Sequence, residues 1–153
     1  MKKQYTFEEL LHKAASYCSI SEHCASEVEQ KLRVWEVEEA DRKKIIAQLT
    51  ADDFINEKRY AKAFVRDKFR LSKWGKIKIT MALREKGIEK DIINNALNTI
   101  DEGEYDEMLA SLLKSKVKTL KFEFEYEKQG KLFRFAQSRG FENQVIERVL
   151  RYI

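Results

Sequence analysis

A pattern of glycine and apolar residues recurs along this chain at intervals of just over 50 positions. Residues 87–100 share it with residues 140–153, which lie 53 positions later. A weaker copy begins at Leu32, 51 positions before Leu83, but it has no glycine. Units of this length bury one face against their neighbours and build an elongated, curved body. We therefore predict one domain, residues 1–153, made of about three units. The units are expected at residues 1–54, 55–103 and 104–153.

The spacing of apolar residues within the units is typical of amphipathic helices. In residues 56–70, and again in residues 76–86, apolar side chains return every three or four positions, so each segment has one apolar face. The chain contains no proline and only five glycines. A β-sandwich or barrel needs turn residues about every 8–12 positions. We predict an all-α fold of tandem three-helix repeats.

Capping residues predict where some of the helices begin. Thr6 and Asn56 precede amphipathic stretches, and each is expected to accept a hydrogen bond from the first turn of a helix. Ser19 and Glu22 have the spacing of a capping box. This spacing predicts that a second helix begins at Ser19.

Two glycines and one aromatic segment complete the predicted frame. Gly87 and Gly140 each follow a helical stretch and are expected to adopt the left-handed conformation that ends many helices. A longer helix is predicted from Tyr105 to about Leu120. Residues 122–126 alternate aromatic and acidic side chains, but five residues without a partner strand do not define a sheet. We interpret them as a connector whose aromatic rings pack on the core.

Positive charge is concentrated in the middle unit. From Arg66 to Lys86 there are eight basic residues and two acidic ones, although the net charge of the whole chain is only +4. This pattern predicts a surface that binds phosphates or acidic groups, with an affinity that falls steeply with salt. The predicted surface contains Arg66, Arg70, Lys73, Lys76, Lys78, Arg84 and Lys86. A solvated helix face explains the same charges, and the pattern alone does not separate the two interpretations.

A second basic group follows in the third unit. Lys114, Lys118 and Lys121 recur at spacings of four and three, which predicts that they share one helix face. This face is interpreted equally well as a secondary partner-binding surface and as a solvated one.

Trp74 and Arg59 are interpreted as structural. Trp74 interrupts the basic segment, and its large ring is expected to pack on the protein rather than stack on a partner. Arg59 is expected to pair with an acid of the preceding turn and so to hold two units together.

The chain contains no recognisable motif for catalysis, for a cofactor or for a metal. His12, Cys18, His23 and Cys24 are metal-ligand types, but neither a CxxC nor an HxxxH spacing is present. The glycines occur singly and form no phosphate-binding loop. We expect no enzymatic activity, no cofactor and no metal.

The chain also carries no evident targeting segment. Its first ten residues lack the apolar core of a signal peptide, and no run of about 18 apolar residues could span a membrane. We expect a cytoplasmic monomer that does not bind membranes. In a reducing compartment, Cys18 and Cys24 are expected to be free thiols.

The middle unit also resembles a known family in the order of its residues. The relevant positions are Asn56-Glu57-Lys58-Arg59-Tyr60-Ala61 and Phe64, followed by Gly75, Ile79, Leu83, Lys86, Gly87 and Ile88. Their spacing resembles the central motif of the RecX family, which are bacterial regulators of the RecA recombinase. The resemblance is strongest over residues 54–100. Two positions depart from the family pattern: Asn56 replaces an aspartate, and Tyr17-Cys18-Ser19 stands where basic residues are more usual.

The resemblance implies a regulatory function without catalysis. A protein of this family is expected to lie in the helical groove of the RecA–DNA filament, bridge its subunits and inhibit ATP hydrolysis and strand exchange in recombination and DNA repair. The implied partners are the RecA filament and, through the basic surface, single- or double-stranded DNA. The alternative is a non-catalytic helical DNA-binding module with no recombinase partner.

Overall fold

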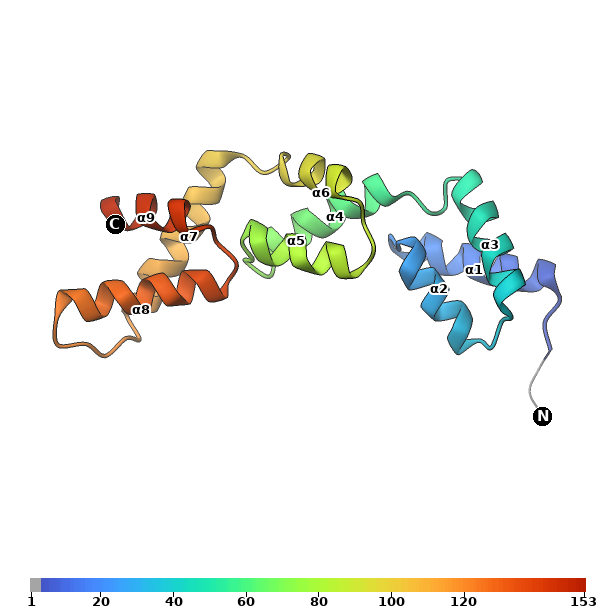
Figure 1. Ribbon diagram of the computed structural model, residues 1–153, viewed down its shortest axis with the longest axis horizontal. Coiled ribbons are helices and arrows are strands. Elements are labelled where there is room, and N and C mark those ends of the chain that lie inside the picture. Colours follow the sequence, from blue (N-terminus) through green and yellow to red (C-terminus); the bar gives the residue numbers. More distant parts are fainter. Residues whose placement is uncertain (1–3) are drawn as a thin grey trace.

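The protein is an elongated row of helices, and its computed structural model describes residues 4–153 (Figure 1). These residues form nine α-helices and no β-strand. The helices are α1 (Phe7–Ile20), α2 (Ala25–Val34), α3 (Glu39–Ala51), α4 (Glu57–Arg70), α5 (Lys76–Glu85), α6 (Lys90–Leu97), α7 (Glu102–Val117), α8 (Glu125–Ser138) and α9 (Asn143–Tyr152). The prediction of an all-α fold is confirmed. In the described part of the chain, no helix has the length and apolarity to cross a membrane.

The helices pack mainly in consecutive groups of three. The closest helix pairs lie within α1–α3, within α4–α6 and within α7–α9. The three groups follow one another along the long axis of the molecule, and α2, α5 and α8 lie along the same long edge (Figure 1). We call these groups the first, middle and third units. The boundaries after residues 54 and 103 remain a prediction.

The apolar faces of the units form two cores. The first core lies within α1–α3 and is built around the fully buried Val28, Leu32 and Ile45. The second core runs continuously through the middle and third units, from Val65 and Ile79 to Ile146. The middle and third units are therefore packed together more closely than the first and middle units.

The turn between the second and third helices is the same in every unit. Glu36, Gly87 and Gly140 occupy its left-handed position, with φ of 60°, 81° and 91°. The following residue donates its amide hydrogen back into the preceding helix, with N···O distances of 3.0, 3.1 and 3.2 Å at Val37, Ile88 and Phe141. The predicted left-handed conformation of both glycines is confirmed. Glu36 adopts the same conformation in the copy that lacks the glycine.

Helices α1 and α4 begin where their capping residues predict, but α2 does not. The side-chain oxygens of Thr6 and Asn56 accept the amide hydrogens of Glu9 and Arg59, at 3.1 and 3.0 Å. Ser19 does not begin a helix. It lies in the last turn of α1, where its hydroxyl donates to the carbonyl of Ala15 at 2.9 Å, so this local hydrogen bond replaces the predicted cap.

The second helix begins at Ala25 rather than at Ser19, with Cys24 as its N-cap residue. The Cys24 amide donates to the Glu27 carboxylate at 3.3 Å, which satisfies one donor at the start of α2. The thiol of Cys24 is fully buried and belongs to the core of the following units.

The third unit corrects two further predictions. Asp101 accepts the amide hydrogen of Glu104 at 2.9 Å, so α7 begins at Glu102, before the predicted start at Tyr105. It ends at Val117 rather than near Leu120. The connector that follows does not place its aromatic rings on the core: Phe122, Phe124 and Tyr126 are all exposed, and the rings of Phe124 and Tyr126 stack on each other with centroids 5.6 Å apart.

Backbone groups join the middle unit to the third. The amide of Gly75 donates to the carbonyl of Arg139 at 2.7 Å, and the amide of Ile77 donates to the carbonyl of Gly140 at 2.9 Å. A β-carbon on Gly75 would lie only 2.5 Å from the amide nitrogen of Phe141. Two backbones can approach this closely only where side chains are missing, so both glycines are required at this junction.

Side chains join the first unit to the middle unit. Arg59 of α4 forms an ion pair with Glu22 and another, at 3.2 Å, with Asp53. It also donates to the backbone carbonyl of Asp53 at 3.0 Å. The hydroxyl of Ser26 donates to the carbonyl of Lys86 at 2.6 Å. The predicted role of Arg59 in holding two units together is confirmed.

Candidate partner-binding surface

The basic residues predicted to bind a partner lie on the end of α4, on the following turn and along α5. The middle unit, residues 55–103, contains 12 basic and 7 acidic residues. Residues 1–54 contain 8 basic and 11 acidic residues, and residues 104–153 contain 10 and 8. The positive charge of the chain therefore comes chiefly from the middle unit, and the first unit is acidic.

Three of the seven predicted residues form ion pairs within the described part of the chain. Arg66 pairs with the adjacent Asp67 at 3.3 Å, and Arg70 pairs with Glu104 of the third unit at 3.5 Å. Lys86 pairs with Glu27 of the first unit at 3.3 Å. These contacts neutralise part of the predicted surface, and two of them bridge units.

Trp74 is held between two lysines at the start of α5. Its ring is half-buried and packs against the shared core, which confirms the predicted packing. The ammonium groups of Lys68 and Lys78 each lie 4.7 Å from the ring centre. Such contacts are favourable because the face of the indole carries negative potential. They fix the two charges beside the tryptophan.

Lys76 lies at the junction with the third unit. Its ammonium group lies 4.8 Å from the ring centre of Tyr105, and its backbone amide donates to the Tyr105 hydroxyl at 2.8 Å. That hydroxyl in turn donates to the Glu142 carboxylate. Burial, and then the hydrogen bond to Glu142, raise the pKa of Tyr105, so the hydroxyl stays protonated and keeps donating.

Lys73 and Arg84 are the most accessible of the predicted residues around α5. Both are exposed. Lys73 has a φ of 58°, a left-handed conformation that is uncommon outside glycine, at the turn before α5. Arg84 lies in the last turn of α5. Together with Lys76 and Lys78 they give α5 and the turn before it four basic residues, against one exposed acid, Glu85.

The outer face of α5 itself is apolar, which sequence reasoning missed. Ile77 is 47% exposed and Met81 is 61% exposed. Their spacing of four places them side by side on the helix. In the sequence Ile77 belongs to the same apolar pattern as Ile79 and Leu83, and only the packing shows that its side chain lies outside the core.

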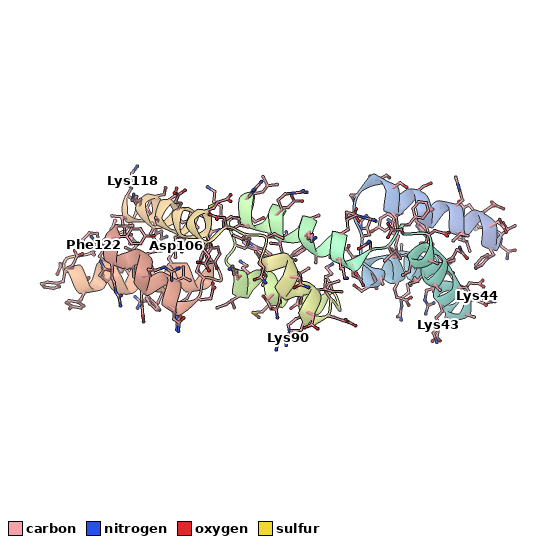
Figure 2. All side chains as sticks on the ribbon, turned by 90° about the horizontal axis from the view of Figure 1, so that it is seen from above. Lys43, Lys44, Lys90, Asp106, Lys118 and Phe122 are labelled. Atoms are coloured by element: carbon pink, nitrogen blue, oxygen red, sulfur yellow. The ribbon has the colours of Figure 1, made fainter. Side chains whose placement is uncertain are left out.

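The secondary basic group does not form a single helix face. Lys114 lies in α7, but the helix ends at Val117, so Lys118 caps it and Lys121 belongs to the connector. The backbone carbonyl of Lys121 accepts a hydrogen bond from the Lys131 ammonium group at 2.5 Å. Figure 2 shows Lys118 and Phe122 near the end of the molecule that is formed by the third unit.

Glu27 is the central acid of the junction between the first and middle units. Its carboxylate accepts from the Cys24 amide, pairs with Lys86 and contacts the His23 ring at 3.2 Å. Burial alone would raise the pKa of Glu27, but these three partners outweigh it and hold the pKa below its usual value. The ionised carboxylate therefore stabilises the folded junction.

This depressed pKa predicts acid sensitivity at the junction. Its contribution is present above the unfolded-state pKa of about 4.3 and is lost as the pH falls through the lower folded-state pKa. We expect Glu27→Gln to lower the melting temperature near pH 7. The difference from the wild type should shrink steadily below about pH 4. Thermal unfolding of both proteins between pH 3 and pH 7 checks this, and a difference that does not depend on pH would contradict it.

The described residues offer no evident metal or nucleophile site. Within residues 4–153, no three His, Cys, Asp or Glu side chains are grouped to hold a metal ion. Cys18 and Cys24 are buried free thiols, and burial raises the pKa of both. A raised pKa disfavours the reactive thiolate. These cysteines are part of the cores.

Comparison with known proteins identifies the family of this helical array. The family model for the second three-helix domain of RecX matches residues 56–97, and the model for the third three-helix domain of RecX matches residues 104–150. Together the two matches cover more than half of the chain. This chain belongs to the RecX family.

Named relatives support the assignment. The regulatory protein RecX of Clostridium beijerinckii is 32% identical over 129 residues, which are 83% of this chain and 60% of the relative. The regulatory protein RecX of Prosthecochloris aestuarii is 29% identical over 140 residues, which are 92% of this chain and 90% of the relative. The chain spans about 60% of the length of the clostridial relatives that it matches.

Solved structures of the family have the same fold. The crystal structure of RecX from Lactobacillus salivarius gives a TM-score of 0.85 at 27% identity, over 95% of this chain and 94% of that one. Another crystal structure of a regulatory protein RecX gives a TM-score of 0.84 over 95% of this chain and 73% of that one. At 23% identity, this second likeness shows the fold alone. The arrangement of three-helix units along one axis is therefore shared within the family.

Proposed function

We propose that this chain binds a RecA–DNA filament and inhibits its ATP hydrolysis and strand exchange without catalysing a reaction itself. Membership of the RecX family carries the proposal, because the relatives are named regulatory proteins. The elongated row of units also suits a long, repetitive partner, since an extended array offers a continuous surface.

The basic surface of the middle unit is proposed as the principal contact. Lys73, Lys76, Lys78 and Arg84 gather around one helix, while the first unit carries more acidic than basic residues. Positive charge attracts an acidic partner over about 10 Å at moderate salt. The secondary group of Lys114, Lys118 and Lys121 is proposed as a weaker contact near the end of the molecule.

A titration of DNA-dependent ATP hydrolysis by RecA tests this function. We expect the hydrolysis rate and the yield of strand exchange to fall as the protein is added. Unchanged rates at saturating protein would contradict the regulatory role. Strong salt-dependent binding to naked DNA, combined with unchanged RecA activity, would instead favour the alternative of a helical DNA-binding module.

A further inference from the structure

The outer face of α5 has two exposed apolar side chains, and basic residues lie near them in the sequence. Ile77, which lies between Lys76 and Lys78 in the sequence, is 47% exposed, and Met81 is 61% exposed. Phosphate groups gain nothing from contact with such side chains, because apolar surface is stabilised only when another apolar surface covers it. The exposed apolar residues therefore favour a partner that has apolar surface of its own.

The scaffold does not require these two apolar residues. The repeat places Ile77 at the position of Ser26 in α2 and of Gly130 in α8. The buried positions behave differently: Val28, Ile79 and Leu132 are equivalent in the repeat, and all three lie in a core. The helical frame thus fixes the inner face and leaves the outer face free to vary.

Met81 also lies at a position of the repeat that is not apolar in the other two units. Met81 is equivalent to Gln30 in α2 and to Arg134 in α8, both polar and both exposed. Of the three equivalent helices, α5 alone has a large apolar residue at both positions, and it lies in the most basic unit. A methionine beside a branched aliphatic residue is typical of the centre of a protein–protein interface, because its flexible thioether adapts to the partner.

We propose that the outer face of α5 docks on a protein surface that is apolar at its centre and acidic around it, rather than on nucleic-acid phosphates. This inference rests on the proposed function, since it names the filament's protein as the component that this surface contacts. Ile77 and Met81 supply the buried centre. Lys73, Lys76, Lys78 and Arg84 supply the charged rim that steers the encounter.

Exchanging the apolar pair for the residues of α2 tests the docking face. The variant Ile77→Ser, Met81→Gln carries the side chains that the first unit has at these positions, and both sites are exposed, so the fold loses little packing. We expect its affinity for the RecA–DNA filament to fall about tenfold or more. The dependence of affinity on salt should stay as in the wild type, because no charge changes.

The matched control changes two exposed apolar residues elsewhere. Ile20 and Val34 of the first unit are 85% and 64% exposed, and Ile20→Gln with Val34→Gln should leave filament binding unchanged. Filament binding that survives loss of the apolar pair, but falls when Lys73, Lys76 and Lys78 become alanine, would overturn the docking face and leave the proposed function standing. A wild-type protein that does not bind the filament would overturn both.

Crosslinking gives a measurement that does not depend on a loss of affinity. A photo-reactive amino acid in place of Met81 should join the chain to the protein of a RecA–DNA filament on illumination. A crosslink to the DNA and not to the protein would overturn the proposal. The same residue in place of Val34 is the control, and it should give neither product.

Discussion

Gly140→Ala should lower the free energy of unfolding by about 4 kcal/mol and the melting temperature by about 10 °C. Two costs add at this position. The backbone has a φ of 91°, which strains any residue with a β-carbon. The added β-carbon would also lie 2.7 Å from the backbone nitrogen of Lys78, in the middle of the junction between two units. Chemical denaturation measures the loss.

Gly87 provides a matched control for this prediction. It has the equivalent place in the repeat and a φ of 81°, but a β-carbon there would meet no atom within 4 Å. Gly87→Ala should therefore cost only about 1 kcal/mol, from the backbone strain alone. Equal losses at the two glycines would show that the contact with Lys78 contributes nothing.

Gly75→Ala measures the steric clash without the backbone strain. Gly75 has a φ of −80°, which any residue can adopt, so its substitution adds the steric clash without the backbone strain. We expect a loss of about 2 kcal/mol. Because this change and Gly140→Ala act on the same contact, the double variant should lose less than the sum of the two single losses.

The repeat made much of this frame predictable from the sequence. Equivalent turns place Glu36, Gly87 and Gly140 in one conformation, and the apolar spacing between them correctly indicates which faces are buried. A prediction from a short stretch of sequence is reliable where the backbone conformation depends only on residues that are neighbours in the sequence. The left-handed glycines and the caps at Thr6 and Asn56 are of this kind.

The junctions between units could not be predicted in the same way. Gly75 and Gly140 are 65 positions apart, and neither contains a side chain whose chemistry would indicate a partner. Their contact is made by backbone atoms, so it depends on the placement of whole units. Sequence spacing correctly predicts that both residues end or begin helices, but it contains no information that they meet.

The exposed apolar residues were missed for a related reason. Periodicity cannot separate Ile77 from Ile79, because α5 is short and both occur among alternating lysines. The interpretation of residues 122–126 as a connector predicts that the rings of Phe122 and Phe124 pack on the core. In the structure the connector turns away after Val117 and leaves them exposed.

The predicted binding surface stays a prediction, but the structure sharpens which residues should be changed to test it. Arg66, Arg70 and Lys86 form ion pairs with neighbouring acids, and Lys86 also supports a junction. Their substitution would alter stability and binding together. Lys73, Lys76 and Lys78 are better targets, since within residues 4–153 none of them forms an ion pair with an acid of another element.

Changing Lys73, Lys76 and Lys78 together to alanine should weaken binding to the RecA–DNA filament about tenfold to a hundredfold. The affinity should also become less dependent on salt, because fewer charges meet the partner. Helical content, measured by circular dichroism, should not change. Alanine keeps the β-carbon of Lys78 that packs at Gly140, the backbone amide of Lys76 still reaches Tyr105, and Lys68 still covers the Trp74 ring.

A second triple variant separates this surface from the overall charge. Lys43 and Lys44 lie on α3 of the first unit and Lys90 begins α6, so none of the three lies on α5, and all three are exposed (Figure 2). Changing them to alanine removes the same charge and should leave filament binding within about twofold of the wild type. If both triple variants lose affinity equally, binding depends on net charge alone. If the first unfolds, its lysines are structural and the assignment of the surface to them is wrong.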